Sequence, residues 1–415
     1  MAGHVQDRWY KTEKGSDGNL RRVRSDRFGM GLRYRARYVG PDGTEKSQSF
    51  PDRQKRKAED WLREIEADMS RGQFIDPKAA RVTFRQYAEK WLETQTTDVN
   101  TQASVSTQVR RHAIPYLGMR PMDSFESKHI REWLSQLSKA VVAESYRAVI
   151  FRSVFAIFNA AVEDRLRTTN PCRSRTITVP GRSKPRIRPW SKGRAAAVRN
   201  ALPDRYRAMV DVGAGEGLRQ GEIFGLPEDE IDFAAGWLHV RYQVKDVGGH
   251  LVFAPPKGGK ERDVPLAGAV GESIKAHLTQ FPAVDVTLPW KTTDGPLVTK
   301  RLVFTTDDGK ALNRSVFNRY VWKPALAAAG ALPPREPGKP YRASREDGVH
   351  ALRHLFASLV LAGGGNIKML SVYLGHSDPG FTLRIYVHLM PDSDEQTRRA
   401  VDGAFRDGPW TADGP

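Results

Sequence analysis

The sequence predicts a multidomain α+β protein: a small three-stranded sheet plus a helix, then a helical bundle, then a mainly α domain with a small antiparallel sheet. At 415 residues the chain is too long for one ordinary core, so two or three domains are expected. Alternating apolar and basic residues near the N-terminus are typical of strands, whereas apolar residues at helical spacing dominate residues 84–162. After these helices, residues 173–189 carry six basic residues, three prolines and no acid, which is typical of a linker.

The chain is strongly basic, with 66 Lys and Arg against 48 Asp and Glu and a net charge of +18. This excess favours a polyanionic partner, with nucleic acid the first candidate and an anionic membrane surface the competing one. Mean hydropathy is −0.54, no apolar run approaches the length of a membrane span, and no hydrophobic signal segment opens the sequence. The single cysteine, Cys172, excludes an intramolecular disulfide and a cysteine-rich zinc site. We therefore expect a soluble cytoplasmic protein that binds nucleic acid and no membrane.

Residues 1–75 form the first predicted domain, with three short strands at Trp9–Lys11, Gly31–Tyr38 and Glu45–Phe50. A turn at residues 40–43 joins the last two strands, and Asp52 is expected to cap a following helix that packs on the sheet. The second strand alternates apolar residues with basic ones, which predicts one covered face and one basic face made by Arg33, Arg35 and Arg37. These arginines either solubilise the sheet or bind DNA, and the charge of the whole chain favours DNA.

Residues 76–175 form the second predicted domain, which is all-helical. Its aromatic residues recur at helical spacing, as in a packed core rather than a cofactor site, and Asn170–Pro171 closes its last, long helix. The linker at residues 176–189 follows. Its basic residues either keep the segment soluble or neutralise phosphates along a DNA groove; the predicted contacts are Arg182, Lys184, Arg186 and Arg188.

The third predicted domain covers residues 190–408 and opens with a helix that stops at a Gly-rich turn. Arg219 begins the next helix, with Glu222 one turn later. Either Glu222 is only a favourable first-turn carboxylate and Arg219 a surface residue, or Glu222 orients the Arg219 guanidinium to bind phosphate oxygens in pairs. Downstream, alternating runs predict a small antiparallel sheet; the turn between its last two strands carries Lys257 and Lys260.

Three short helices are predicted near the C-terminal end. The first presents His350 and Arg353 on one face, with His354 one turn after His350. The second ends at His376, and the third carries Tyr386. Taken singly, a histidine–arginine pair at this spacing is more often a solvated helix face than a site, and a lone tyrosine is more often half-buried than functional.

Arg219 with Glu222, His350-x-x-Arg353, His376 in Leu-Gly-His-Ser, and Tyr386 together resemble the signature of the tyrosine recombinase (phage integrase) family. The resemblance spans the C-terminal half of the chain, and one departure is the ten-residue spacing from His376 to Tyr386, one more than is usual. It implies an arm-type DNA-binding domain, a core-binding (SAM-like) domain and a catalytic domain, in that order. It also implies that a turn lysine enters the site, with Lys257 as first choice and Lys260 as rival.

The resemblance further implies a reaction in which Tyr386 cleaves DNA and forms a 3′-phosphotyrosyl link. Arg219 and Arg353 would bind the phosphate in the transition state, and His376 would donate to it. Lys257 would protonate the leaving 5′-oxygen, and His350 is the first choice to accept the tyrosine proton. Glu222 and His354 are expected to support these groups. No cofactor or metal is expected, because no carboxylate cluster suited to Mg²⁺ accompanies the motifs.

The expected function is site-specific recombination that integrates or excises a phage or mobile element in a bacterial host cell. Expected partners are double-stranded DNA at attachment sites, three further copies of the chain in a homotetramer, an excisionase or directionality factor, and a host DNA-bending protein. A C-terminal helix at residues 393–405 would pack on a neighbouring subunit. The alternatives are a type IB topoisomerase, against which the N-terminal domain argues, and a non-catalytic DNA-binding protein.

Overall fold

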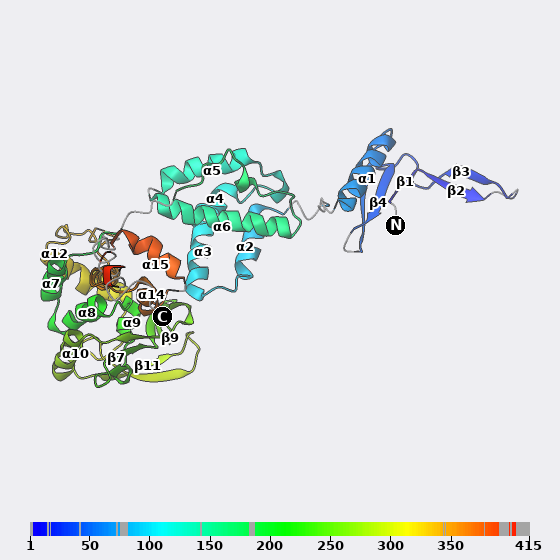
Figure 1. The fold of residues 1–415 in the computed structure, drawn as a ribbon. Coiled ribbons are helices and arrows are strands. Elements are labelled where there is room, and N and C mark those ends of the chain that lie inside the picture. The colour runs from blue at the N-terminus through cyan, green and yellow to red at the C-terminus, as the bar shows by residue number, and fades with distance from the viewer. Residues whose placement is uncertain are drawn as a thin grey trace, which may run out of the picture. The chain divides into compact units, whose positions relative to one another are not determined.

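The computed structural model describes residues 3–14, 16, 18–40, 43–71, 74, 82–141, 143–181, 187–342, 344, 346–376, 378–389, 398 and 401–403. It divides the chain into two compact units, Met1–Lys184 and Pro185–Pro415. Among the described residues, the first unit contains two hydrophobic cores and the second contains one. Figure 1 shows the helices and strands that surround them. Arg182, Lys184 and Arg186 lie outside the described residues, as does most of the predicted C-terminal helix, whereas Arg188 is described and exposed.

The first core lies between a three-stranded antiparallel sheet and helix α1 (Lys55–Ser70). The strand order is β1 (His4–Asp7), β4 (Tyr34–Val39) and β5 (Glu45–Phe50). Alternate residues of β4 are buried, and they pack against Leu62 and Ile65 of the helix. The predicted alternation of β4 and the covering helix are therefore both present in the fold.

The prediction for the first strand was wrong. Trp9–Lys11 is not in the sheet, because His4–Asp7 pairs with β4 instead. Tyr10 and Lys11 belong to a separate two-stranded hairpin, β2 (Tyr10–Lys14) with β3 (Leu20–Arg24), whose residues are exposed or half-buried. The short apolar pattern of β1 is carried mainly by Val5, which packs on the core, so its sequence signal is weak.

Asp52 does not cap α1, contrary to the prediction. Gln54 occupies that position without a side-chain hydrogen bond, and Asp52 instead accepts a hydrogen bond from Arg33 at 2.9 Å. Arg33 is also bound by Asp7, Arg37 pairs with Glu45 at 3.0 Å, and Arg35 donates to Ser47. The predicted basic face exists, but acidic neighbours offset the charges of Arg33 and Arg37.

The second core is a helical bundle. Its helices are α2 (Phe84–Glu93), α3 (Val99–His112), α4 (Ile114–Leu117), α5 (Ser127–Ala140) and α6 (Glu144–Glu163). Contrary to the expectation that no apolar run approaches the length of a membrane span, helix α6 is long and apolar enough to cross a membrane by length and composition. Its apolar residues, however, form the centre of this core, including Ile150, Val154, Ile157 and Phe158.

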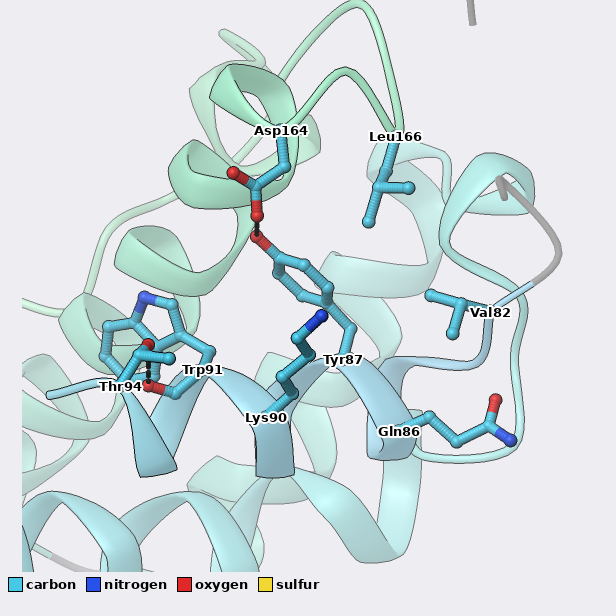
Figure 2. Close-up of a pocket in the computed structure, with 8 residues that line it drawn as sticks. All are labelled: Val82, Gln86, Tyr87, Lys90, Trp91, Thr94, Asp164 and Leu166. Carbon is cyan, nitrogen blue, oxygen red and sulfur yellow. Dashed lines mark hydrogen bonds between the residues drawn. The ribbon is translucent and has the colours of Figure 1, made fainter. Parts of the chain in front are cut away.

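A hollow of about 600 Å³ lies on this bundle beside α2 (Figure 2). The Tyr87 hydroxyl donates a 2.6 Å hydrogen bond to Asp164 there, which joins the beginning of α2 to the residue after α6. Burial and the Asp164 carboxylate raise the pKa of Tyr87 above its usual range. The hollow is lined by Val82, Gln86, Tyr87, Lys90, Trp91, Thr94, Asp164 and Leu166.

The second unit has a single core surrounded by nine α-helices among its described residues. They are α7 (Lys192–Ala201), α8 (Asp204–Gly215), α9 (Gln220–Phe224), α10 (Gly268–Gln280), α11 (Arg314–Phe317), α12 (Lys323–Ala328), α13 (His350–Ala362), α14 (Ile367–Tyr373) and α15 (Pro379–Tyr386). Its strands are β6 (Ile231–Asp232), β7 (Trp237–Val240), β8 (Gln243–Val247), β9 (His250–Ala254), β10 (Arg262–Pro265), β11 (Val284–Pro289) and β12 (Leu297–Leu302).

The strands of the second unit form three small antiparallel sheets, ordered β10-β7-β6, β8-β9 and β11-β12. The predicted run from Trp237 to Val244 is thus divided between β7 and β8. Because β9 pairs with β8 while β10 pairs with β7, the lysine turn connects two sheets rather than the two strands of one hairpin. The three predicted C-terminal helices are present as α13, α14 and α15 (Figure 1).

Candidate active site

The turn between α8 and α9 positions Arg219, the first arginine of the site. Gly217 adopts a φ of 66°, in the left-handed region that favours glycine, and the chain then reverses into α9 with Arg219 at its N-cap. Glu222, one turn later, accepts from the Arg219 backbone N–H and from its Nη1, both at 2.8 Å. This pair of bonds holds the Arg219 side chain in one orientation.

The second arginine, Arg353, is 1% exposed on α13. Its Nη1 donates to the carbonyl of Gly217 at 2.8 Å, and its Nη2 donates to the carbonyl of Leu374. Arg219 Nη2 donates to the same Leu374 oxygen at 3.2 Å. Two guanidinium groups from segments more than 130 residues apart therefore converge at the end of α14.

His376 lies beside this pair, and its tautomer follows from its partners. Arg353 Nη2 approaches His376 Nε2 at 3.1 Å, and a guanidinium can only donate, so Nε2 is the accepting nitrogen. The proton is then on Nδ1, which donates to the hydroxyl of Thr382 at 2.8 Å. Thr382 is fully buried on α15 and was not identified from the sequence.

Tyr386 is 1% exposed, and its hydroxyl lies 2.7 Å from Nδ1 of His354. The sequence predicts His350 as the acceptor of the tyrosine proton and His354 as a supporting residue. In the structure His350 is exposed and stacks edge-on against His354, with ring centroids 4.7 Å apart. The histidine that contacts the tyrosine is therefore His354, one helical turn after His350.

Burial and cationic neighbours keep the site histidines neutral. Burial and Arg353 lower the pKa of His354 to about 4, and burial, Arg353 and Arg219 lower the pKa of His376 to about 4. Burial raises the pKa of Tyr386 to about 12, although the Arg353 charge opposes that effect. The tyrosine therefore stays protonated until a base accepts its proton.

The turn η5 (Lys257–Gly259) carries both predicted lysines, and Lys257 and Lys260 are exposed. Among the residues that the structure describes, neither lysine makes a hydrogen bond to the arginines or histidines of the site. The next strand, β10, begins at Arg262, which is buried and reaches the carboxylate of Glu222. Sequence reasoning missed Arg262; the available signal was its position two residues before the apolar Val264, on the inward face of a strand.

Family comparisons agree with this geometry. Residues 194–392 match the model of the phage integrase family, and residues 83–138 match the N-terminal SAM-like domain of phage integrases. The chain belongs to the phage integrase family. As a member of this family it is a tyrosine recombinase. The matched range contains the arginines, histidines and tyrosine described above, which are Arg219, Arg262, His350, Arg353, His354, His376 and Tyr386.

Integrases are also among the most similar curated proteins. The tyrosine recombinase is 28% identical over 394 residues to the putative prophage phiRv2 integrase of Mycobacterium tuberculosis, covering 93% of this chain and 95% of that one. It is 26% identical to the integrase of Mycobacterium phage D29, covering 92% of this chain and 96% of the relative.

Solved structures share the fold. The Tn1549 transposon integrase in complex with circular intermediate DNA aligns with a TM-score of 0.63 at 18% identity, covering 78% of this chain and 100% of that one. A lambda integrase tetramer bound to a Holliday junction aligns with a TM-score of 0.54 at 17% identity, covering 86% of this chain and 93% of that one.

Proposed function

We propose that this recombinase is a site-specific integrase that cleaves and rejoins DNA through a 3′-phosphotyrosyl intermediate, and so integrates or excises a phage or mobile element. The observation that carries the proposal is the convergence of Arg219 and Arg353 on one main-chain oxygen, Leu374 O, beside His376. Guanidinium groups fixed in this way form a preorganised site for the non-bridging oxygens of a phosphodiester. The tyrosine nucleophile belongs to the same core.

In the proposed reaction the Tyr386 oxygen attacks phosphorus in line with the 5′-oxygen. The new bond is the tyrosine–phosphorus ester, the bond broken is that to the 5′-oxygen, and the tyrosine proton passes to His354 Nδ1. Lys257, or its neighbour Lys260, protonates the leaving oxygen. Because the ester conserves the bond energy, a 5′-hydroxyl from a second strand can reverse the step without ATP.

In this proposal the two arginines provide most of the electrostatic stabilisation of the transition state. The transition state places extra charge on the non-bridging oxygens, and Arg219 and Arg353 are already oriented by Glu222 and by the Gly217 carbonyl. Removing one such preorganised donor typically costs about 10²–10³ in rate. His376 is neutral and accepts from Arg353 here, so donation to a phosphate oxygen requires it to take up a proton as the phosphate approaches.

We further propose that the first domain binds arm-type DNA, and that the hairpin β2–β3 makes the main contact. Arg33 and Arg37 on the sheet are already paired with acids. On the hairpin, the pairing register puts Arg22, Arg24 and Lys14 on one face, and of these Arg22 is also paired with Asp7. A two-stranded basic ribbon of this kind fits the major groove of DNA.

The proposed assembly is a homotetramer on two DNA duplexes. Its support is the fold shared with a lambda integrase tetramer bound to a Holliday junction. The excisionase and the host DNA-bending protein remain predictions from family resemblance, as does the packing of the C-terminal helix on a neighbouring subunit.

Covalent trapping tests the proposed function. Circular DNA carrying the region beside the gene is incubated with the protein in EDTA, the reaction is stopped with SDS, and protein–DNA adducts are separated on a gel. Wild type should form an adduct that Tyr386→Phe does not form, and sequencing the trapped DNA locates the site. Tight binding without any adduct would favour a non-catalytic DNA-binding protein. Relaxation of supercoils without exchange between two such sites would favour a topoisomerase.

A further inference from the structure

A third arginine, Arg262, lies beneath the two that face the proposed phosphate site. Its side chain is 3% exposed, and it extends from the beginning of β10 to the carboxylate of Glu222. Its Nη1 and Nη2 donate to the two Glu222 oxygens at 3.1 and 2.7 Å. Each of these oxygens also accepts a hydrogen bond from Arg219, so one buried carboxylate joins two arginines.

The same guanidinium reaches the other side of the site. Arg262 Nε donates to the carbonyl of Tyr373 at 2.6 Å, and the next carbonyl along the chain, that of Leu374, accepts from Arg219 and Arg353. Gly375 adopts a φ of 58°, and a Cβ added there would lie 3.2 Å from Arg262 Cδ. The Arg262 stem therefore packs closely against the turn that delivers His376.

Because Glu222 is buried, its charge depends on the hydrogen bonds that Arg262 donates to it. Burial alone would raise the pKa of Glu222, but the hydrogen bonds and charge of Arg262, together with Arg219, lower it to about 2. An arginine presents N–H donors on three nitrogens in a fixed plane, and Arg262 uses all three nitrogens. A lysine has one compact ammonium group, which cannot reach both carboxylate oxygens and a carbonyl in the same way.

We propose that Arg262 is a positioning residue for DNA cleavage, which acts through Glu222 on Arg219 and through Tyr373 on the turn carrying His376. Its buried guanidinium donates to Glu222 and to the Tyr373 carbonyl, so we assign its effect on cleavage to these two groups. Its position at the base of β10 also anchors one end of the turn that carries Lys257 and Lys260. The inference rests on the proposed function, and it adds a residue that aligns the phosphate-binding groups with one another.

The test compares Arg262→Lys with wild type on a duplex of the sequence that wild type traps covalently. Arg199→Lys is the control, because Arg199 of α7 also pairs with a carboxylate, donating from Nε to both oxygens of Asp211 on α8. Three quantities are measured: the rate of adduct formation at saturating DNA, the Kd for that duplex, and the Tm. Arg262→Lys should slow adduct formation by about 10- to 100-fold, as small misplacements of reacting groups do. Its Kd and Tm should change no more than those of the control.

A double-mutant cycle separates positioning through Glu222 from a general structural role. In a Glu222→Gln background, the Arg262→Lys change should lower the rate by much less than it does alone, because the two residues act through one contact. Wild-type rates for Arg262→Lys, or equal effects in both backgrounds, would overturn the inference. A loss of rate matched by an equal loss of folded protein would also overturn it, since Arg262 would then be purely structural. If wild type itself forms no adduct, the proposed function fails and the inference with it.

Discussion

The Tyr386 hydroxyl lies 2.7 Å from Nδ1 of His354, and this contact joins helices that begin 29 residues apart, at His350 and Pro379. A neutral histidine at that distance is in position to accept the phenol proton as the tyrosine attacks. Since burial raises the pKa of Tyr386 to about 12, attack at neutral pH requires such an acceptor. The finding changes which of the two neighbouring histidines should matter most for the nucleophile.

Replacing His354 should therefore impair cleavage more than replacing His350. His354→Phe keeps an aromatic ring but removes the acceptor, and loss of a positioned general base typically costs about 10²–10⁴ in rate. His350→Phe, on the same helix, is the matched comparison. Single-turnover rates of adduct formation measure both. A normal rate for His354→Phe with a slow His350→Phe would return the role of proton acceptor to His350.

Thr382→Val should weaken the contribution of His376. The change removes the acceptor of His376 Nδ1 while keeping the volume of the side chain, so the imidazole is free to take the other tautomer or to rotate. We expect adduct formation to slow by about tenfold while DNA affinity is retained. Thr382→Ser, which keeps the hydroxyl, is the control. If Thr382→Ser cleaves slowly while Thr382→Val cleaves at the wild-type rate, the methyl group and not the hydrogen bond is what matters.

The free energy of unfolding should fall as the pH is lowered from about 6.5 to 4. His354 and His376 have pKa values near 4 in the folded protein, against about 6.5 unfolded, so the unfolded state binds protons first. The stabilisation is present above pH 6.5 and is lost as the pH falls toward 4, at most about 3 kcal/mol for each ring.

Carboxylates also titrate in this pH range. The contribution of the two histidines is therefore obtained as the difference between the free energies of unfolding of wild type and of a variant without them. Urea unfolding of wild type and of His354→Gln/His376→Gln, followed between pH 7 and 4, isolates it. The double variant should show a shallower dependence on pH. Parallel curves for the two proteins would mean that the rings are not held neutral in the folded state.

Basic residues of the hairpin should contribute more to DNA binding than those of the sheet. Lys14→Gln/Arg24→Gln removes two cations from one face of β2–β3 and should lower the slope of log K against log salt by about 1.8, if both contact phosphates. Arg33→Gln/Arg37→Gln should change it less, since acids already pair with these side chains. The full-length protein and DNA containing the arm region are used. A larger change in slope for Arg33→Gln/Arg37→Gln would mean that the sheet face, and not the hairpin, makes the main DNA contact.

Much of the site could be predicted because its residues lie on short, strongly patterned segments. The helix beginning at His350, the short helix before His376, the Arg219 turn and the helix ending at Tyr386 all depend on local periodicity and capping. The first strand of the sheet could not be predicted equally well. His4–Asp7 has little apolar pattern of its own, and its place is decided by pairing with β4, thirty residues away.

By itself, the sequence determined that the chain is basic, and it predicted the domain order and the arginines, histidines and tyrosine of the proposed phosphoryl-transfer site. These properties follow from composition and from local spacing. Only the tertiary structure decided that His354 meets Tyr386, that Thr382 sets the His376 tautomer, and that Arg262 pairs with Glu222 across forty residues. The physical reason is that hydrogen bonds between distant segments depend on how helices and strands pack, and neither helical period nor charge specifies which of two neighbouring side chains will face a partner.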